Sequence, residues 1–174
     1  LKDQSVVING LSKSHAMTGW RIGFTFAPAH ITREIMKVHQ NMVTNVNSIA
    51  QYAATFAMSD GIDDADPMRE EYRTRRDIFC NALTELGFKI AEPNGAFYIF
   101  AKIPDGSNQD SMAFALDLAK KAQVAVVPGI AFGTAGEGYI RLSYAASIEM
   151  IEKAIERISG YIKGGVTHEQ SRIQ

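Results

Sequence analysis

Short apolar runs alternate along the chain with longer segments in which apolar residues recur every three or four positions. The short runs are rich in β-branched or aromatic residues and end at glycine, proline or polar residues, which is typical of strands. Strands are predicted at 5–10, 22–27, 96–103, 124–127 and 139–144. Helical spacing predicts helices at 30–41, 47–59, 67–86, 110–122 and 147–163. This mixture of elements predicts an α/β fold.

The elements fall into two groups with different patterns. Residues 1–66 are predicted to form the end of one α/β domain, and residues 67–164 a compact α+β layer of helices on a small sheet. Asp66 is suited to cap the long helix and Pro67 to occupy its first position. This long helix is therefore predicted to begin the second unit and to bridge it to the first.

The two ends of the sequence carry different expectations. The run at 5–10 is typical of a buried parallel strand, which needs a neighbour on each side, and such neighbours are hard to find downstream. We therefore expect this chain to be the C-terminal part of a longer protein. At the other end, the Gly164-Gly165 pair is predicted to stop the last helix, so residues 165–174 are predicted to form a loose tail.

Composition narrows the class of protein. The 174 residues are 46% hydrophobic, which is enough to fold around a core. A net charge of −1 gives no field that attracts nucleic acid or an anionic membrane, and no apolar run is long enough to span a bilayer. The single cysteine, Cys80, cannot form an internal disulfide and fits a reducing compartment, most simply the cytoplasm. The four histidines show no spacing typical of a metal site.

The first candidate chemistry lies in a polar loop between the first two predicted strands. The loop reads Ser12-Lys13-Ser14-His15-Ala16-Met17-Thr18-Gly19-Trp20-Arg21. The Lys13 amine can condense with an aldehyde cofactor and can then carry a proton between two carbons. Arg21 can hold a phosphate through two parallel hydrogen bonds, and the hydroxyl of Ser12 or Ser14 can add another.

Simpler interpretations exist for both charged residues. Lys13 taken alone is an ordinary loop lysine in solvent, and Arg21 an ordinary surface arginine at the start of a strand. The bulky apolar neighbours Trp20 and Ile22 argue against a surface position for Arg21. The full run of the loop is far more restrictive than a bare Ser-Lys-Ser, and it favours the chemical interpretation.

Arg141 is the third candidate. It interrupts the strand predicted at 139–144, whose other residues suit burial, and a charge there needs a partner or a ligand. The planar fork of an arginine matches the carboxylate of an amino acid. Strand alternation equally permits Arg141 to be an exposed residue on an edge strand, and the residue pattern does not separate the two.

Five short motifs together resemble one known family. They are Asn9-Gly10-Leu11-Ser12-Lys13, Met17-Thr18-Gly19-Trp20-Arg21-Ile22-Gly23, Gly95-Ala96-Phe97-Tyr98, Val126-Val127-Pro128-Gly129 with Phe132-Gly133, and Tyr139-Ile140-Arg141-Leu142-Ser143. Over residues 5–163 the chain is similar to the C-terminal half of class I (fold-type I) pyridoxal-phosphate-dependent aminotransferases. The resemblance implies the end of the large cofactor-binding domain, with a mixed, mostly parallel sheet, followed by the small α+β C-terminal domain.

The same resemblance implies a reaction and a site. The reaction is transamination between an amino acid and a 2-oxo acid through a Schiff base of pyridoxal 5'-phosphate. Lys13 would form that Schiff base, and Arg21 would contact the cofactor phosphate with help from Ser12. Arg141 would bind the substrate carboxylate. Family members are generally homodimers, so the intact protein is expected to be one, and the motifs look most like those of bacterial aromatic and N-acetyl-diaminopimelate aminotransferases.

Two departures from the family pattern limit what the chain can do alone. Gly10 stands where some members have a serine that contacts the phosphate. The aspartate, tyrosine, asparagine and stacking aromatic that hold the cofactor ring in the family lie in its N-terminal half, and none can be assigned here. Without the aspartate the ring is a weak electron sink. We therefore expect the 174-residue chain alone to be inactive or nearly so.

Two other functions remain open on the sequence. The same fold supports pyridoxal-phosphate-dependent lyases and synthases, because a fold does not fix the reaction. An aminotransferase-like sensor domain of a transcription regulator would bind the cofactor but control contact with DNA. A basic helix-turn-helix module would identify such a regulator, and these 174 residues show none.

Overall fold

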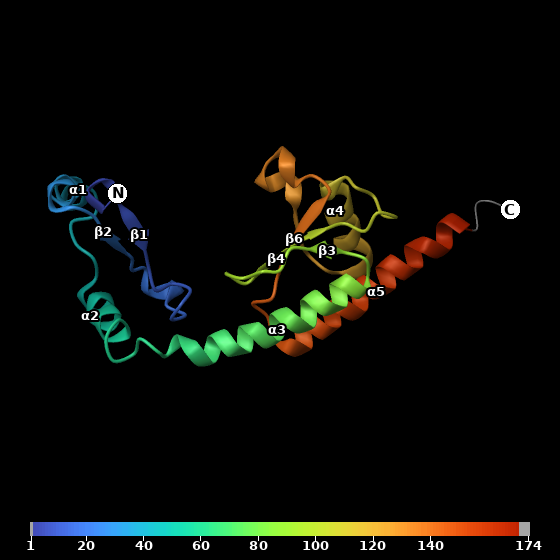
Figure 1. The fold of residues 1–174 in the computed structure, drawn as a ribbon, viewed down its shortest axis with the longest axis horizontal. Coiled ribbons are helices and arrows are strands. Elements are labelled where there is room, and N and C mark those ends of the chain that lie inside the picture. The colour runs from blue at the N-terminus through green and yellow to red at the C-terminus, as the bar shows by residue number, and fades with distance from the viewer. Residues whose placement is uncertain (1, 171–174) are drawn as a thin grey trace. The chain divides into compact units, whose positions relative to one another are not determined.

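The computed structural model describes residues 2–170, with side chains described as far as residue 164. The chain divides into two compact units, the first ending at Arg69 and the second beginning at Glu70. The sequence places this boundary at residue 66, and both positions lie near the start of the long helix α3 (Ala65–Glu85). In Figure 1 the strands and helices of the first unit are coloured blue to teal, and those of the second green to red.

The first unit consists of two short strands and two helices, joined by loops. Its elements are β1 (Val7–Asn9), β2 (Phe24–Phe26), α1 (Ala29–Met42) and α2 (Ser48–Ala57), with 3-10 turns at Lys2–Gln4 and Thr18–Trp20. β1 and β2 pair antiparallel, with Val7 opposite Phe26, and all three residues of β1 are exposed. The predicted buried parallel strand is therefore not what the described residues form, because each of these strands has one partner and open faces.

Side chains cap the starts of α2 and of the last helix, whereas α1 has no side-chain cap. The Asn47 side chain accepts hydrogen bonds from two N–H groups in the first turn of α2, at 2.9 and 3.1 Å. Ser147 accepts one at 3.3 Å in the same way at the start of α5 (Ile148–Gln170). The prediction that Asp66 caps α3 is wrong, because the helix already begins at Ala65. Asp66 instead lies in the first turn and forms an ion pair with Arg69 at 3.0 Å.

The second unit folds around an antiparallel sheet with the strand order β3-β4-β6-β5. The strands are β3 (Lys89–Ile90), β4 (Tyr98–Lys102), β5 (Val127–Pro128) and β6 (Tyr139–Ser143), and the helix α4 (Ser111–Ala122) lies between β4 and β5 in sequence. Two 3-10 turns, Gly129–Phe132 and Thr134–Gly136, connect β5 to β6. β6 has a partner on each side, with Phe100 of β4 and Val127 of β5 both opposite Arg141.

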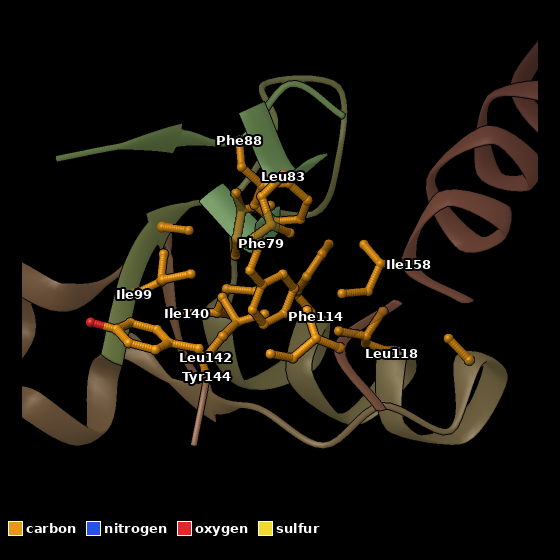
Figure 2. Close-up of a cluster of buried hydrophobic side chains, with 14 residues drawn as sticks. Phe79, Leu83, Phe88, Ile99, Phe114, Leu118, Ile140, Leu142, Tyr144 and Ile158 are labelled. Atoms are coloured by element: carbon orange, nitrogen blue, oxygen red, sulfur yellow. The ribbon is translucent and has the colours of Figure 1, made fainter. Parts of the chain in front are cut away.

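Alternation along the two long strands separates a buried face of the sheet from an open one. Figure 2 shows the buried face, where side chains of β4 and β6 meet those of α3, α4 and α5. The fully buried members include Leu83, Ile99, Leu118, Ile140 and Ile158. The other face carries Tyr98, Phe100, Tyr139 and Arg141, which occupy the alternate positions of the same strands. Because core residues of β4 and β6 are buried, the core fixes β6, the strand that contains Arg141.

Helix α5 is longer than the sequence predicts. It runs to Gln170 and passes through Gly164 and Gly165, so the predicted stop there and the loose tail from 165 to 170 are wrong. A glycine costs a helix only about 1 kcal/mol relative to alanine, so it does not by itself end one. The last part of that predicted tail, 171–174, lies outside the described residues. None of the helices within 2–170 combines the length and the apolar character that crossing a membrane requires.

Candidate active site

Lys13 lies in a compact loop between β1 and β2. The Leu11 carbonyl accepts hydrogen bonds from the N–H groups of His15 at 3.2 Å and Met17 at 3.3 Å, which closes the chain into a tight turn around Lys13. The side chains of Leu11 and Met17 are buried and belong to one apolar cluster with two alanines of α2. Two buried residues therefore anchor the backbone on either side of Lys13, while the lysine side chain itself is exposed.

Thr18 joins the two ends of the loop. Its hydroxyl donates to the carbonyl oxygen of Ser12 at 2.8 Å, and its own carbonyl accepts a hydrogen bond from Arg21 Nη1 at 3.0 Å. The residue before the lysine and the guanidinium are thus held in one hydrogen-bonded unit. Among the described residues this is the one hydrogen bond of the Arg21 side chain, and a guanidinium has five N–H donors. The remaining donors can take an anion such as a phosphate.

Two residues of this loop have the left-handed backbone that glycine usually adopts. Ala16 has φ +53° and Arg21 has φ +51°. Such conformations are uncommon for other residues, and they gather at functional sites. The prediction from Trp20 and Ile22 that Arg21 avoids a surface position is wrong, because both Arg21 and Trp20 are exposed. The backbone turns at Arg21, and β2 begins at Phe24 instead of residue 22.

His15 ties the loop to the segment that follows α2. Its Nε2 lies 3.2 Å from the Gly61 carbonyl oxygen and its Nδ1 lies 2.9 Å from Ser14 Oγ. Because a carbonyl only accepts, Nε2 must donate, and Nδ1 of the neutral ring then accepts from the Ser14 hydroxyl. Ser14 is therefore engaged with His15. Of the two hydroxyls that the sequence offers for a phosphate, Ser12 is the better placed.

Gly10 has little room for a side chain. A Cβ at this position would lie 3.1 Å from the Ile22 carbonyl oxygen and 3.3 Å from Gly23 Cα, which is tighter than most real contacts. Backbone crowding between the end of β1 and the start of β2 thus accounts for glycine where some family members have serine. Any anion bound by this loop would therefore lack a hydroxyl from position 10.

Arg141 belongs to an inner strand, so the interpretation as an edge-strand residue is wrong. The residue is half-buried on the open face of the sheet. Its guanidinium carbon lies 4.2 Å from the centre of the Tyr98 ring and 4.8 Å from the centre of the Phe132 ring. Within the described part of the chain, no oxygen accepts a hydrogen bond from this side chain. The sequence pattern does not pair Tyr98 or Phe132 with Arg141.

Opposite charges offset one another at the rim of this sheet face. A groove of about 500 Å³ lies over it, lined in part by Tyr98, Phe100, Lys102 and Tyr139. The Lys89 and Lys102 amines lie 2.8 and 3.5 Å from the carboxylate of Asp105. The hydrogen bond from Lys89, with the two positive charges, lowers the pKa of Asp105 below its usual range. The Arg141 guanidinium, in contrast, lies against the rings of Tyr98 and Phe132.

The donor set of the first unit fits pyridoxal phosphate. The cofactor carries an aldehyde, which an amine such as Lys13 can bind covalently, and a phosphate, which suits the Arg21 guanidinium and the Ser12 hydroxyl. These three residues lie in one hydrogen-bonded loop of the first unit, and Arg141 lies in the second. Within the described residues, no group of three or more His, Cys, Asp or Glu side chains converges on a point that could hold a metal ion.

Comparison with known proteins gives the family. Residues 2–158 match the family model described as Aminotransferase class I and II. A Bacillus subtilis (strain 168) protein named "Probable N-acetyl-LL-diaminopimelate aminotransferase" is 48% identical over 162 residues, which cover 93% of this chain and 41% of that protein. Aromatic-amino-acid aminotransferase 2 of Thermococcus litoralis is 40% identical, with 92% of this chain and 42% of that protein covered.

Solved structures agree with the sequence comparison. The crystal structure of an aromatic aminotransferase from Pyrococcus horikoshii OT3 matches with a TM-score of 0.87 at 42% identity, covering 94% of this chain and 44% of that one. The chain spans about two fifths of the length of the curated relatives it matches. The family match extends over most of the sequence and includes the loop of Lys13 and the strand of Arg141. The chain belongs to the class I and II aminotransferases.

Proposed function

We propose that the protein containing this chain moves an amino group between an amino acid and a 2-oxo acid, with pyridoxal phosphate as its cofactor. The observation that carries the proposal is the loop in which Thr18 links the backbone beside Lys13 to the Arg21 guanidinium. This loop therefore offers an amine for the aldehyde of the cofactor and a guanidinium for its phosphate. Membership of the aminotransferase family supports the reaction class.

The residues of the first unit would hold the cofactor and move a proton. Lys13 would hold the aldehyde end, and Arg21 with Ser12 would hold the phosphate. When bound, pyridoxal phosphate supplies an electron sink for the bonds at the substrate α-carbon. The Lys13 Nζ would act as general base and acid for the proton at that carbon. Its exposed position between the buried Leu11 and Met17 supports this role, because the anchored backbone presents the side chain at the surface of the unit.

Arg141 would bind the carboxylate of the amino acid or the 2-oxo acid. Its fork has no hydrogen-bond acceptor among the described residues, and it lies on the open face of the sheet. A planar guanidinium binds a carboxylate through two parallel hydrogen bonds, which fixes the orientation of the substrate as well as its charge. Both substrates of a transamination carry such a carboxylate, so one residue serves both halves of the reaction.

The proposal also covers the oligomeric state, the compartment and the kind of amino acid. We expect a homodimer in the cytoplasm, acting on amino acids of the kinds that the relatives' names indicate, aromatic ones or N-acetyl-diaminopimelate. Burial raises the pKa of the Cys80 thiol, which keeps the side chain protonated and suits a packing role on α3. A single packing cysteine without a disulfide partner in these residues fits a reducing compartment.

The experiment is a transamination assay of the intact protein with pyridoxal phosphate, an amino acid of either kind and a 2-oxo acid. Lys13→Ala should lower kcat by about 100-fold or more, because a positioned acid–base group contributes about 10²–10⁴-fold. Lys37→Ala is the matched control, since Lys37 is an exposed lysine of α1 paired with Glu34 at 2.8 Å. Full activity of Lys13→Ala, or no transamination by the intact protein, would contradict the proposal.

A further inference from the structure

The setting of Arg141 is unusual for a charged side chain. Two aromatic rings contact its guanidinium, at 4.2 Å for Tyr98 and 4.8 Å for Phe132, and both distances are within the range of cation–π attraction. Neither ring accepts N–H hydrogen bonds as an oxygen does, so the attraction fixes the charge without using up the fork. An arginine in an ion pair, by contrast, already has part of its fork bonded to a carboxylate.

The two rings come from parts of the second unit that are themselves held firmly. Tyr98 is the first residue of β4 and lies opposite Ser143 of β6. Phe132 ends the 3-10 turn that begins at Gly129. The Phe132 ring also contacts the Phe100 ring edge-on at 5.9 Å. Each ring therefore has a support that does not depend on Arg141.

The turn that carries Phe132 is fixed by close backbone packing. A Cβ on Gly129 would overlap the carbonyl oxygen of Gly136, and a Cβ on Gly136 would overlap that of Gly129, so these two backbone segments touch. The buried Ser111 hydroxyl accepts a hydrogen bond from the Ile130 N–H at 3.2 Å and ties the turn to the start of α4. Phe132 is about half exposed, yet its backbone is anchored on both sides.

We propose that Tyr98 and Phe132 are positioning residues, which order the Arg141 side chain so that its fork is ready for the substrate carboxylate. This inference rests on the proposed function of Arg141. A long side chain that is free to rotate must be ordered when the ligand binds, and that cost weakens binding. The rings order the guanidinium in advance. Their contribution concerns recognition of the carboxylate and leaves the chemical step unchanged.

Kinetics of the intact enzyme test the consequence for substrate binding. Tyr98→Leu and Phe132→Leu should each raise KM for the amino acid by about 2- to 10-fold, the cost of ordering one such side chain, with kcat little changed. Tyr98→Phe keeps the ring and should restore KM. Tyr139→Leu is the matched control, since its ring stacks on Phe100 at 5.2 Å on the same sheet face, whereas the Arg141 guanidinium lies over Tyr98 and Phe132. Unchanged KM in both leucine variants, or an equal rise in Tyr139→Leu, would overturn the inference.

A second measurement separates this inference from the proposed function. Nitrogen-15 relaxation of the Arg141 Nε–H in the intact protein without substrate reports the order of the guanidinium in the absence of any reaction. The order parameter should fall in Tyr98→Leu and Phe132→Leu and stay at the wild-type value in Tyr139→Leu. An unchanged order parameter in the leucine variants overturns the positioning role. Ordered Arg141 in an intact protein that performs no transamination overturns the proposed function instead.

Discussion

The two units keep their candidate residues in place by different means. In the second unit, aromatic and aliphatic side chains from three helices and two strands form a core on one face of the sheet, and Arg141 lies on a strand that this core fixes. The first unit buries Leu11, Met17 and small alanines, while large apolar side chains such as Ile8, Met42 and Tyr52 are about four fifths exposed. The loop of Lys13 is thus held mainly by local hydrogen bonds and two buried anchors.

The difference shows that order at a site need not come from a large core. The Lys13 loop gains its shape from the Leu11 carbonyl, from Thr18 and from His15, all within or next to the loop. Local structure of this kind opens at a lower free energy than a packed core. Exposed apolar surface as extensive as that of the first unit is typical of a surface that other protein atoms cover. We therefore expect the first unit to be the less stable one in the 174-residue chain.

Truncating one buried side chain in each unit should give the largest difference between the units in the free energy of unfolding that is lost. Phe114 is 1% exposed, and its ring contacts the rings of Phe88 and Tyr161 at 6.4 and 5.7 Å. Phe114→Ala should lower the free energy of unfolding of the second unit by about 3–5 kcal/mol. Leu11→Ala should cost the first unit about 2 kcal/mol, the low end for a leucine, because few large neighbours surround it.

Hydrogen exchange read out by mass spectrometry measures these losses separately for the two units. Each variant should lose protection in its own unit, since opening is local. The contrast breaks if Leu11→Ala removes as much protection from the second unit as Phe114→Ala does. That result would mean that the two units unfold as one.

One glycine in each unit allows the same comparison of stability, with a smaller expected difference. Gly129 touches the Gly136 backbone, so Gly129→Ala should force the turn apart and destabilise the second unit by about 1–3 kcal/mol. Gly19 lies in the loop of the first unit with nothing within 4 Å of a Cβ built on it, so Gly19→Ala should change stability by less than about 1 kcal/mol. Urea unfolding of the two variants makes the comparison, and an equal loss in both would show that packing does not distinguish these turns.

Local chemistry made most of the helices predictable. Asn47 and Ser147 cap their helices as their side chains suggest, and the α/β class and the family resemblance are both confirmed. The two-residue strand β3 escaped prediction because it is too short to show alternation. The strand predicted at 124–127 is observed at Val127–Pro128, because the pairing with β6 comprises Val127 and Pro128.

The candidate site was only partly predictable. The motif identified Lys13, Arg21 and Arg141 as residues, and their roles stay predictions. The neighbours of Arg141 depend on the register between β4 and β6 and on a 3-10 turn, neither of which a local pattern encodes. The inner position of β6 likewise depends on a strand order that does not follow the sequence. Alternation alone could have placed Tyr98 and Arg141 on the open faces of their strands, but could not have paired them.

The most direct test of the account is to identify the amine that binds the cofactor. The intact protein is incubated with pyridoxal phosphate, reduced with borohydride, digested and mapped by mass spectrometry. The account predicts a phosphopyridoxyl adduct on Lys13, in the peptide that contains Ser12 and Ser14, and its loss in Lys13→Ala. An adduct confined to any other lysine, or the same labelling in Lys13→Ala, would contradict the central claim that this loop holds the cofactor.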